Sequence, residues 1–175
     1  AGRRMRTLVT GGAGYVGSVC VERLLAEGHA VTVVDDLSEG HRAAVAPGAD
    51  FCEGNFGDPA LLDALMAKAR PEAVLHFAGS TLVGESMKNP LKYFQNNTAN
   101  ALNLLHCAAE FGVGKFIFSS TCSTYGIPET IPTTETPPQR PVNPYGESKR
   151  MFEQMLKWHA EQTSTEAVIF RYFNA

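Results

Sequence analysis

The chain has 175 residues, of which 44% are hydrophobic and 19% charged, and its formal net charge is −3 at pH 7. This composition is typical of one soluble globular domain that is long enough to bury a core. No basic block indicates nucleic acid binding, and the short, interrupted apolar runs exclude a membrane span.

Strand-like apolar runs alternate with helix-length amphipathic segments along the whole chain. We expect strands at 6–10, 30–35, 49–54, 73–79, 115–120 and 166–173, and helices at 16–27, 59–70, 90–112 and 144–162. Runs of Val, Ile, Leu and Phe between helices predict a doubly wound (Rossmann) α/β fold, mostly parallel, with helices on both faces. The irregular stretch 121–142, rich in Thr and Pro, is long enough to be a functional loop.

The cysteines and histidines do not form a pattern that binds metal. The four cysteines are scattered without a CxxC pair, and three lie in helix- or strand-like apolar stretches; they are Cys20, Cys52, Cys107 and Cys122. We expect buried free thiols, no metal site and a cytoplasmic protein, since the cytoplasm is reducing. His76 ends an apolar strand and is expected to be a hydrogen-bonded core residue.

A glycine-rich turn separates the first strand from the first helix. The segment TGGAGYVG places Gly11, Gly14 and Gly17 at intervals of three residues. The first glycine suits a tight turn, the second the close approach of a pyrophosphate, and the third the packing of helix on strand. The helix N-terminus favours phosphate as well, so the pattern predicts a dinucleotide site.

Two carboxylates follow the second strand. Asp35 stands at the separation expected for a residue that binds the adenosine ribose, and Asp36 follows it. A carboxylate there would repel a 2′-phosphate, so NAD is favoured over NADP. The alternative interpretation is that both aspartates only begin a loop.

NPYGESK, residues 143–149, contains a tyrosine and a lysine four residues apart. On a helix, Tyr145 and Lys149 share one face, with Asn143 as the expected N-cap. A nearby ammonium and the positive nicotinamide would lower the pKa of the phenol, which makes it a base for alcohol oxidation. Hydroxyls of the FSSTCSTYG segment, which follows the fifth strand, are placed to hold a sugar hydroxyl beside Tyr145.

These stretches together resemble the UDP-glucose 4-epimerases (UDP-galactose 4-epimerases) of the extended short-chain dehydrogenase/reductase family. The resemblance covers nearly the whole chain and rests on LVTGGAGYVGS, VVDDLS, LHFAG, VGES, NPLKYFQNN, KFIFSST, NPYGESK and RYFN. It implies NAD as cofactor, a UDP-sugar as substrate and C4 epimerisation through a 4-keto intermediate.

The resemblance also implies the site residues. The catalytic residues would be Thr121, Tyr145 and Lys149, and the residues on the substrate Thr121, Tyr145 and Asn174. The cofactor would contact Gly11, Gly14, Tyr15, Val16, Gly17, Asp35, Asp36, Asn55, Phe56, Phe77, Ala78, Gly79, Asn96, Ser119, Tyr145, Lys149 and Phe173. Asn55 replaces an aspartate of many relatives, and Thr81 stands where some relatives carry a lysine near the cofactor phosphates.

Alternatives remain at the level of activity. Related dehydratases carry an Asp-Glu acid/base pair beside the catalytic threonine, whereas Cys122 and Ser123 follow Thr121 here. We expect residues 1–175 to form the NAD-binding Rossmann domain, with the family's smaller C-terminal substrate domain absent. The chain would then be an epimerase, another nucleotide-sugar epimerase of the family, or an NAD-binding module with little catalysis. The resemblance further implies a homodimer through helices 90–112 and 144–162, unless a partner chain completes the enzyme.

Overall fold

The computed structural model describes residues 3–174, and within them six strands form a single parallel sheet. The strands are β1 (Arg6–Thr10), β2 (Ala30–Asp35), β3 (Asp50–Glu53), β4 (Ala73–His76), β5 (Lys115–Thr121) and β6 (Glu166–Tyr172). Their order in the sheet is β3-β2-β1-β4-β5-β6. The chain therefore reverses its direction of travel between β1 and β4, which confirms the predicted doubly wound fold.

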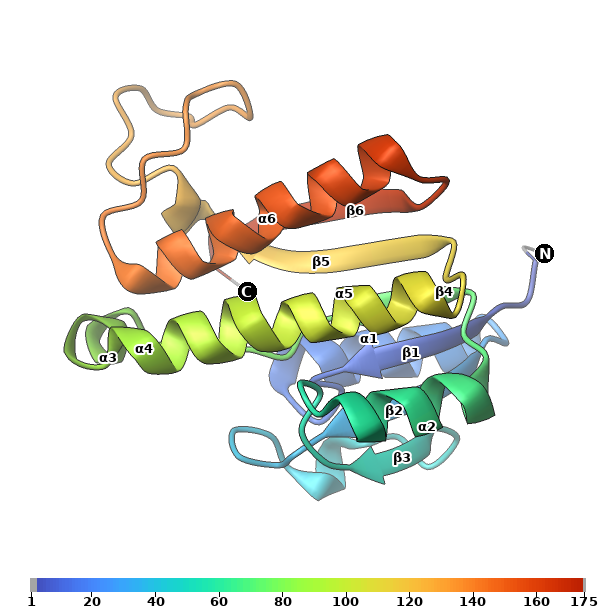
Figure 1. Cartoon of the computed structure of the whole chain (residues 1–175). Coiled ribbons are helices and arrows are strands. Elements are labelled where there is room, and N and C mark those ends of the chain that lie inside the picture. Colours follow the sequence, from blue (N-terminus) through green and yellow to red (C-terminus); the bar gives the residue numbers. More distant parts are fainter. Residues whose placement is uncertain (1–2, 175) are drawn as a thin grey trace.

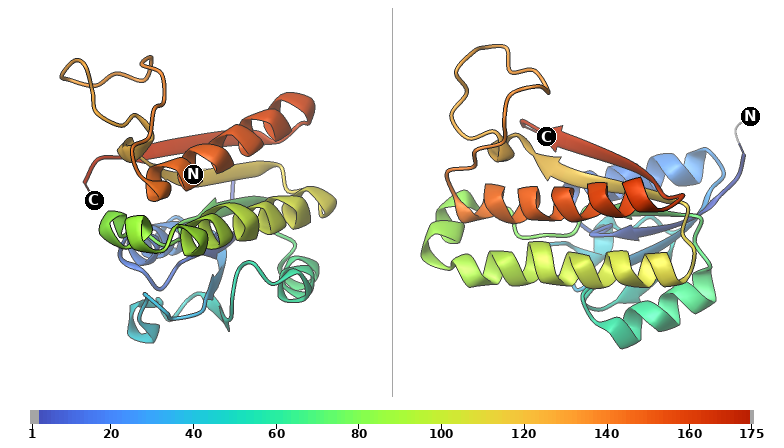
Figure 2. Two further views of the ribbon diagram at one scale, coloured as in Figure 1. Left: turned by 60° about the vertical axis from the view of Figure 1, so that its left-hand side comes forward. Right: turned by 45° about the horizontal axis from the view of Figure 1, so that its top comes forward.

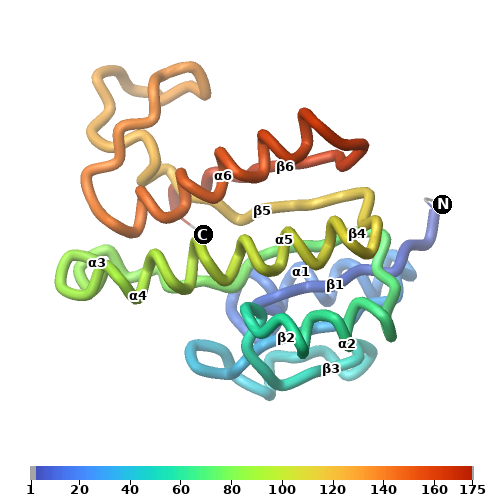
Figure 3. Tube along the Cα trace, in the orientation of Figure 1, coloured from blue at the N-terminus to red at the C-terminus, as the bar shows by residue number. Residues whose placement is uncertain are grey.

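Helices cover both faces of the sheet. They are α1 (Tyr15–Ala26), α2 (Pro59–Ala69), α3 (Val83–Lys88), α4 (Pro90–Tyr93), α5 (Asn100–Glu110) and α6 (Pro144–Gln162), with a π-helical segment η2 (Phe94–Ala99) and two 3-10 turns, η1 (Arg42–Ala44) and η3 (Cys122–Thr124). In Figure 1, α2, α5 and α6 lie in front of the sheet and α1 lies behind it. The tube in Figure 3 shows that α4, η2 and α5 form one continuous run beside α6, with α3 as a separate turn at its outer end.

Alternation along the strands divides the core into two clusters. Leu8 and Val74 pack with the helices α2, α5 and α6, whereas their neighbours Val9 and Leu75 pack with α1. This is the period of two that a strand imposes on its side chains. Both central strands are apolar on both faces because both faces are covered.

The structure differs from the expected elements in three places. The helix expected at 90–112 contains the π segment η2, which interrupts the α-helical spacing. The strand expected at 73–79 ends at His76, because the Phe77 and Ala78 amides both donate to the Thr10 carbonyl and the regular ladder stops there. The short helix α3 was not predicted, because its six residues, VGESMK, are too few to show an apolar period.

Two expectations about side chains have different outcomes. All four cysteines are free. Of the three expected to be buried in apolar stretches, Cys107 is buried. Cys20 and Cys52 are half-buried, because α1 and the edge strand β3 each have one open side. His76 is buried, and its Nδ1 lies 2.6 Å from the Thr10 hydroxyl, as expected of a core histidine.

The loop 125–142 projects beyond the carboxyl end of the sheet in both views of Figure 2. It joins η3 to α6, so it lies beside the strand ends where sites of open α/β sheets form. No helix within residues 3–174 is long and apolar enough to cross a bilayer.

Candidate active site

A groove of about 420 Å³ opens at the carboxyl ends of the strands, where the strand order reverses. Its size suits a small-molecule ligand. Ten of the predicted cofactor residues line it: Gly11, Gly14, Asp35, Asp36, Asn55, Phe56, Phe77, Ala78, Gly79 and Asn96. They come from the turns after β1, β2, β3 and β4 and from η2, so segments far apart in sequence build one groove.

The three glycines of the first turn have three different surroundings. Gly11 has φ +72°, and a Cβ there would lie 2.5 Å from the Ala78 nitrogen. A Cβ on Gly17 would collide with the Gly11 carbonyl oxygen. A Cβ on Gly14 would meet only that same oxygen, at 3.4 Å, and would otherwise occupy the groove. The backbone at Gly14 is thus open to a ligand, which fits a phosphate group.

The two aspartates at the end of β2 both line the groove and both bond to backbone. Asp35 accepts hydrogen bonds from the Ala13 and Leu37 amides, each at 2.9 Å, so it fixes the glycine turn. Asp36 accepts from the Ser38 amide at 3.0 Å. Asp35 and Asp36 therefore both hold the loop in place and line the groove.

Asn55, after β3, likewise both bonds to backbone and lines the groove. Its Oδ1 accepts a hydrogen bond from the Gly57 amide at 2.7 Å, while the residue lines the groove. Phe56 beside it is buried against His76, with ring centroids 5.0 Å apart.

The Tyr145–Lys149 pair lies at the start of α6, as predicted. The Asn143 side chain caps the helix by accepting from the Gly146 amide at 2.7 Å. Lys149 is buried and donates to the Ser119 carbonyl at 3.0 Å, with its Nζ 5.0 Å from the centre of the Phe118 ring. Burial lowers the pKa of Lys149 to about 8, although the Glu153 carboxylate acts in the opposite direction.

The predicted effect of Lys149 and the nicotinamide on the pKa of Tyr145 stays a prediction, and the groups around Tyr145 act on that pKa in both directions. Burial raises the pKa of Tyr145 above its usual value, a polar contact with Thr121 lowers it, and Cys122 raises it. The lysine ammonium is directed to the Ser119 carbonyl. Thr121 is therefore the neighbour in this structure that favours the tyrosinate.

The groove and the pair meet at Gly79. A Cβ on Gly79 would lie 3.1 Å from Lys149 Nζ and 2.9 Å from Asn97 Oδ1. Asn97 is buried and bonds to both Ser80 and Ser148, so it joins the turn after β4 to α6. Asn97 was not among the predicted site residues, although the polar run QNN in the middle of a helix was a signal.

The remaining predicted residues lie outside the lining of the groove. Tyr15 and Phe173 are exposed, Val16 and Ser119 are half-buried, and Gly17 is buried at the base of α1; Asn174 is exposed after β6. The groove also has lining residues that were not predicted: Ser38, Glu39, Gly40, Ser80, Lys92, Gln95 and Asn100. Lys92 lines the groove as well, and its ammonium donates to Glu85 Oε1 at 2.7 Å.

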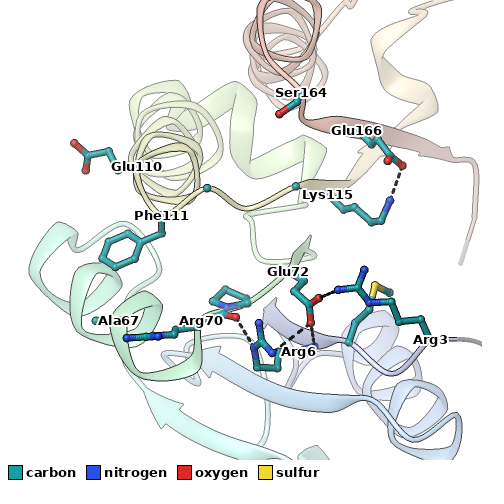
Figure 4. Close-up of a pocket in the computed structure, with 14 residues that line it drawn as sticks. Arg3, Arg6, Ala67, Arg70, Glu72, Glu110, Phe111, Lys115, Ser164 and Glu166 are labelled. Carbon is teal, nitrogen blue, oxygen red and sulfur yellow. Dashed lines mark hydrogen bonds and ion pairs between the residues drawn. The ribbon is translucent and has the colours of Figure 1, made fainter.

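A larger hollow of about 850 Å³ lies at the opposite, amino-terminal end of the sheet (Figure 4). Five of its charged side chains pair with one another: Glu72 pairs with Arg3 and Arg6, and Lys115 donates to Glu166 at 2.6 Å. These five charges are balanced by one another, and we assign no function to this hollow. Across residues 3–174, no three His, Cys, Asp or Glu side chains gather as metal ligands would.

The strand order and the glycine turn at its reversal point define a Rossmann-type nucleotide-binding fold. Residues 7–175 match the NAD dependent epimerase/dehydratase family, and the chain belongs to this family. The UDP-glucose 4-epimerase of Streptococcus mutans is 52% identical over 97% of this chain and 52% of its own length.

Solved structures agree with this assignment. UDP-glucose 4-epimerase from Brucella ovis in complex with NAD is 43% identical with a TM-score of 0.92, over 96% of this chain and 51% of that one. The Thermotoga maritima enzyme with UDP-glucose is 36% identical with a TM-score of 0.92, over 95% and 54%. The expected resemblance is confirmed, and the chain spans about half the length of the curated relatives it matches.

Proposed function

We propose that residues 1–175 form an NAD-binding domain whose site epimerises a UDP-hexose, UDP-glucose or UDP-galactose, at C4. The observation that carries this proposal is the junction at Gly79, where the groove meets the buried ammonium of Lys149. Epimerase relatives at up to 52% identity, and neighbours solved with NAD or UDP-glucose, support it.

The chain's own residues fit the cofactor. The open backbone at Gly14 would receive the pyrophosphate, and Asp35 and Asp36 would face the adenosine ribose. Lys92 lines the same groove, where its ammonium is paired with Glu85. When bound, NAD⁺ would accept the hydride of the sugar C4 and return it to the opposite face.

Tyr145 would remove the proton from the sugar 4-hydroxyl and later give it back. Its contact with Thr121 stabilises the phenolate, and Thr121 would also hold or relay the proton. A pKa of about 8 leaves Lys149 mainly protonated at neutral pH, so it remains a positive neighbour of the site. Elimination of water needs an acid that Cys122 and Ser123 do not supply, which favours epimerisation over dehydration.

One observation favours a second candidate, an NAD-binding module with little catalysis of its own. Val168 and Phe170 on β6 are 46% and 49% exposed, and Phe173 beyond them is 60% exposed. An apolar sheet face of this kind is normally covered. Within residues 3–174 this apolar face of β6 is uncovered, whereas the cofactor groove is lined by described residues.

We also propose a homodimer in the cytoplasm. The helices α5 and α6 lie side by side and expose Leu102 and Trp158, which are 44% and 65% exposed. The free cysteines support a reducing compartment. Sedimentation of the wild type and of Trp158→Lys tests the dimer. We expect a dimeric wild type and a monomeric variant, and a wild type that sediments as a monomer would contradict the proposal.

The test of the function is to measure NAD affinity and UDP-glucose/UDP-galactose interconversion for the wild type and Tyr145→Phe. We expect the variant to lose about 10²–10⁴-fold in kcat, because it lacks the acid/base hydroxyl, while NAD affinity and thermal midpoint stay near wild type. NAD binding without turnover in the wild type would select the module, and no NAD binding would reject both candidates.

A further inference from the structure

A buried carboxylate lies one helical turn beyond Lys149 on α6. Glu153 is 0% exposed and accepts hydrogen bonds from Ser120 Oγ at 2.5 Å and Gln139 Nε2 at 2.8 Å. Arg171 donates to it from Nη2 at 2.7 Å and from Nε at 3.0 Å, which forms a two-pronged ion pair. One side chain thus joins α6, β5, β6 and the loop before α6.

These four segments also carry the candidate catalytic and substrate residues. Ser120 immediately precedes Thr121, and Arg171 lies two residues before Phe173. Ser120 and Arg171 are direct neighbours in the register of β5 and β6. Since both donate to Glu153, the carboxylate fixes the two strand ends against the helix face that bears Tyr145 and Lys149.

Arg171 extends the same cluster to the loop. Its Nη1 donates to the Tyr125 hydroxyl at 2.6 Å, and its guanidinium lies 4.9 Å from the centre of the Tyr125 ring. The loop is therefore held at both ends, by Tyr125 after η3 and by Gln139 before α6.

Stability alone does not account for a buried ion pair in this place. Withdrawing two charges from water is costly, and apolar residues of similar volume often stabilise a protein as well or better. The cluster also contacts the site electrostatically: burial lowers the pKa of Lys149, and the Glu153 carboxylate partly offsets this because it favours the ammonium.

We propose that Glu153 is a positioning residue of the epimerisation site, which holds Thr121 on β5 in place against Tyr145 and Lys149 on α6 through its bonds to Ser120 and Arg171. It touches none of the reacting atoms. This inference rests on the proposed function and deepens it, since the residue lies outside the groove and outside the set expected to bind cofactor or substrate.

The test compares the wild type with Glu153→Gln, Ser120→Ala and the control Glu147→Gln. Glu147 also pairs with an arginine, Arg150 at 2.8 Å, but at a half-buried position of the same helix. The measurements are kcat and KM for UDP-hexose interconversion, NAD affinity, thermal midpoint and amide hydrogen exchange of segments 119–125 and 171–174.

For Glu153→Gln we expect kcat to fall about tenfold to a hundredfold, as small displacements of reacting groups do. KM and the NAD Kd should change by less than about threefold, since groove contacts remain. Amide hydrogen exchange should become faster in segments 119–125 and 171–174. Ser120→Ala should lower kcat by less, and Glu147→Gln should match the wild type in every measurement.

Wild-type kcat in a folded Glu153→Gln variant, or loss of kcat with unchanged exchange, would overturn the proposal. If Glu153→Gln does not fold, Ser120→Ala decides by the same criteria, because it keeps the ion pair and removes only the bond to β5. If the wild type binds NAD without turnover, the proposed function fails separately. In that case amide hydrogen exchange alone tests the positioning role. Protection of both segments in Glu153→Gln equal to that in the wild type would reject it.

Discussion

The glycines after β1 differ in what surrounds the place where a Cβ would be added. Gly17→Ala puts a methyl group into the Gly11 carbonyl, so we expect the free energy of unfolding to fall by about 1–3 kcal/mol. Gly14→Ala has room in the folded chain, because its nearest neighbour would be 3.4 Å away, but its methyl group would enter the groove. We expect a near-native thermal midpoint and NAD affinity reduced by about tenfold or more, which corresponds to about 1.4 kcal/mol.

Thermal unfolding and NAD titration of both variants check this pair of outcomes. Each variant is the control for the other, since both are single methyl additions to the same turn. Wild-type NAD affinity in Gly14→Ala would mean that the ligand does not approach the glycine turn.

The start of α6 shows how an element places a functional residue. Asn143 caps this helix, and Tyr145 lies in its first turn. Asn143→Ala removes the cap and should lower the free energy of unfolding by about 1 kcal/mol, as loss of an N-cap does. It should also lower kcat, because a frayed first turn no longer holds Tyr145 against Thr121.

Asp58→Ala is the matched control. Asp58 caps α2 by accepting from the Ala60 amide at 3.0 Å, and α2 carries no predicted site residue. We expect about the same loss of stability with kcat retained. Equal losses of kcat in both variants would mean that the cap of α6 affects activity only through global stability.

Over the whole molecule, the buried His76 makes stability depend on pH. Burial and, secondarily, the charge of Lys149 hold the pKa of His76 well below its usual value. The unfolded chain takes up this proton near pH ~6.5. The unfolded state therefore binds more protons below that pH, so this contribution to stability is complete above about 6.5 and is lost as pH falls, by up to about 1.4 kcal/mol per pH unit.

Chemical denaturation between about pH 7.5 and pH 5 measures the effect. His76→Phe suits the surrounding rings of Phe56 and Phe118, and it should flatten the dependence of unfolding free energy on pH. Its loss of the Thr10 hydrogen bond lowers stability at every pH and does not change the slope. A slope in His76→Phe identical to that of the wild type would contradict the argument.

Much of the fold and part of the site were predictable because their signals are local. The apolar runs, the spacing of Gly11, Gly14 and Gly17, and Asn143 before Pro144 each act over a few residues. The parallel order and the position of the groove follow once strands alternate with helices. The role of each site residue remains a prediction that the proposed experiments test.

Sequence by itself therefore determined the α/β architecture, the family resemblance and the candidates Tyr145, Lys149 and Thr121. Only the tertiary structure decided their electrostatics, because burial depends on what every other segment covers: it raises the pKa of Tyr145 and lowers that of Lys149. It also decided the pairing of Glu153 with Arg171, 18 residues along the chain. No local pattern connects those two side chains, and they meet only because β6 lies beside β5 beneath α6.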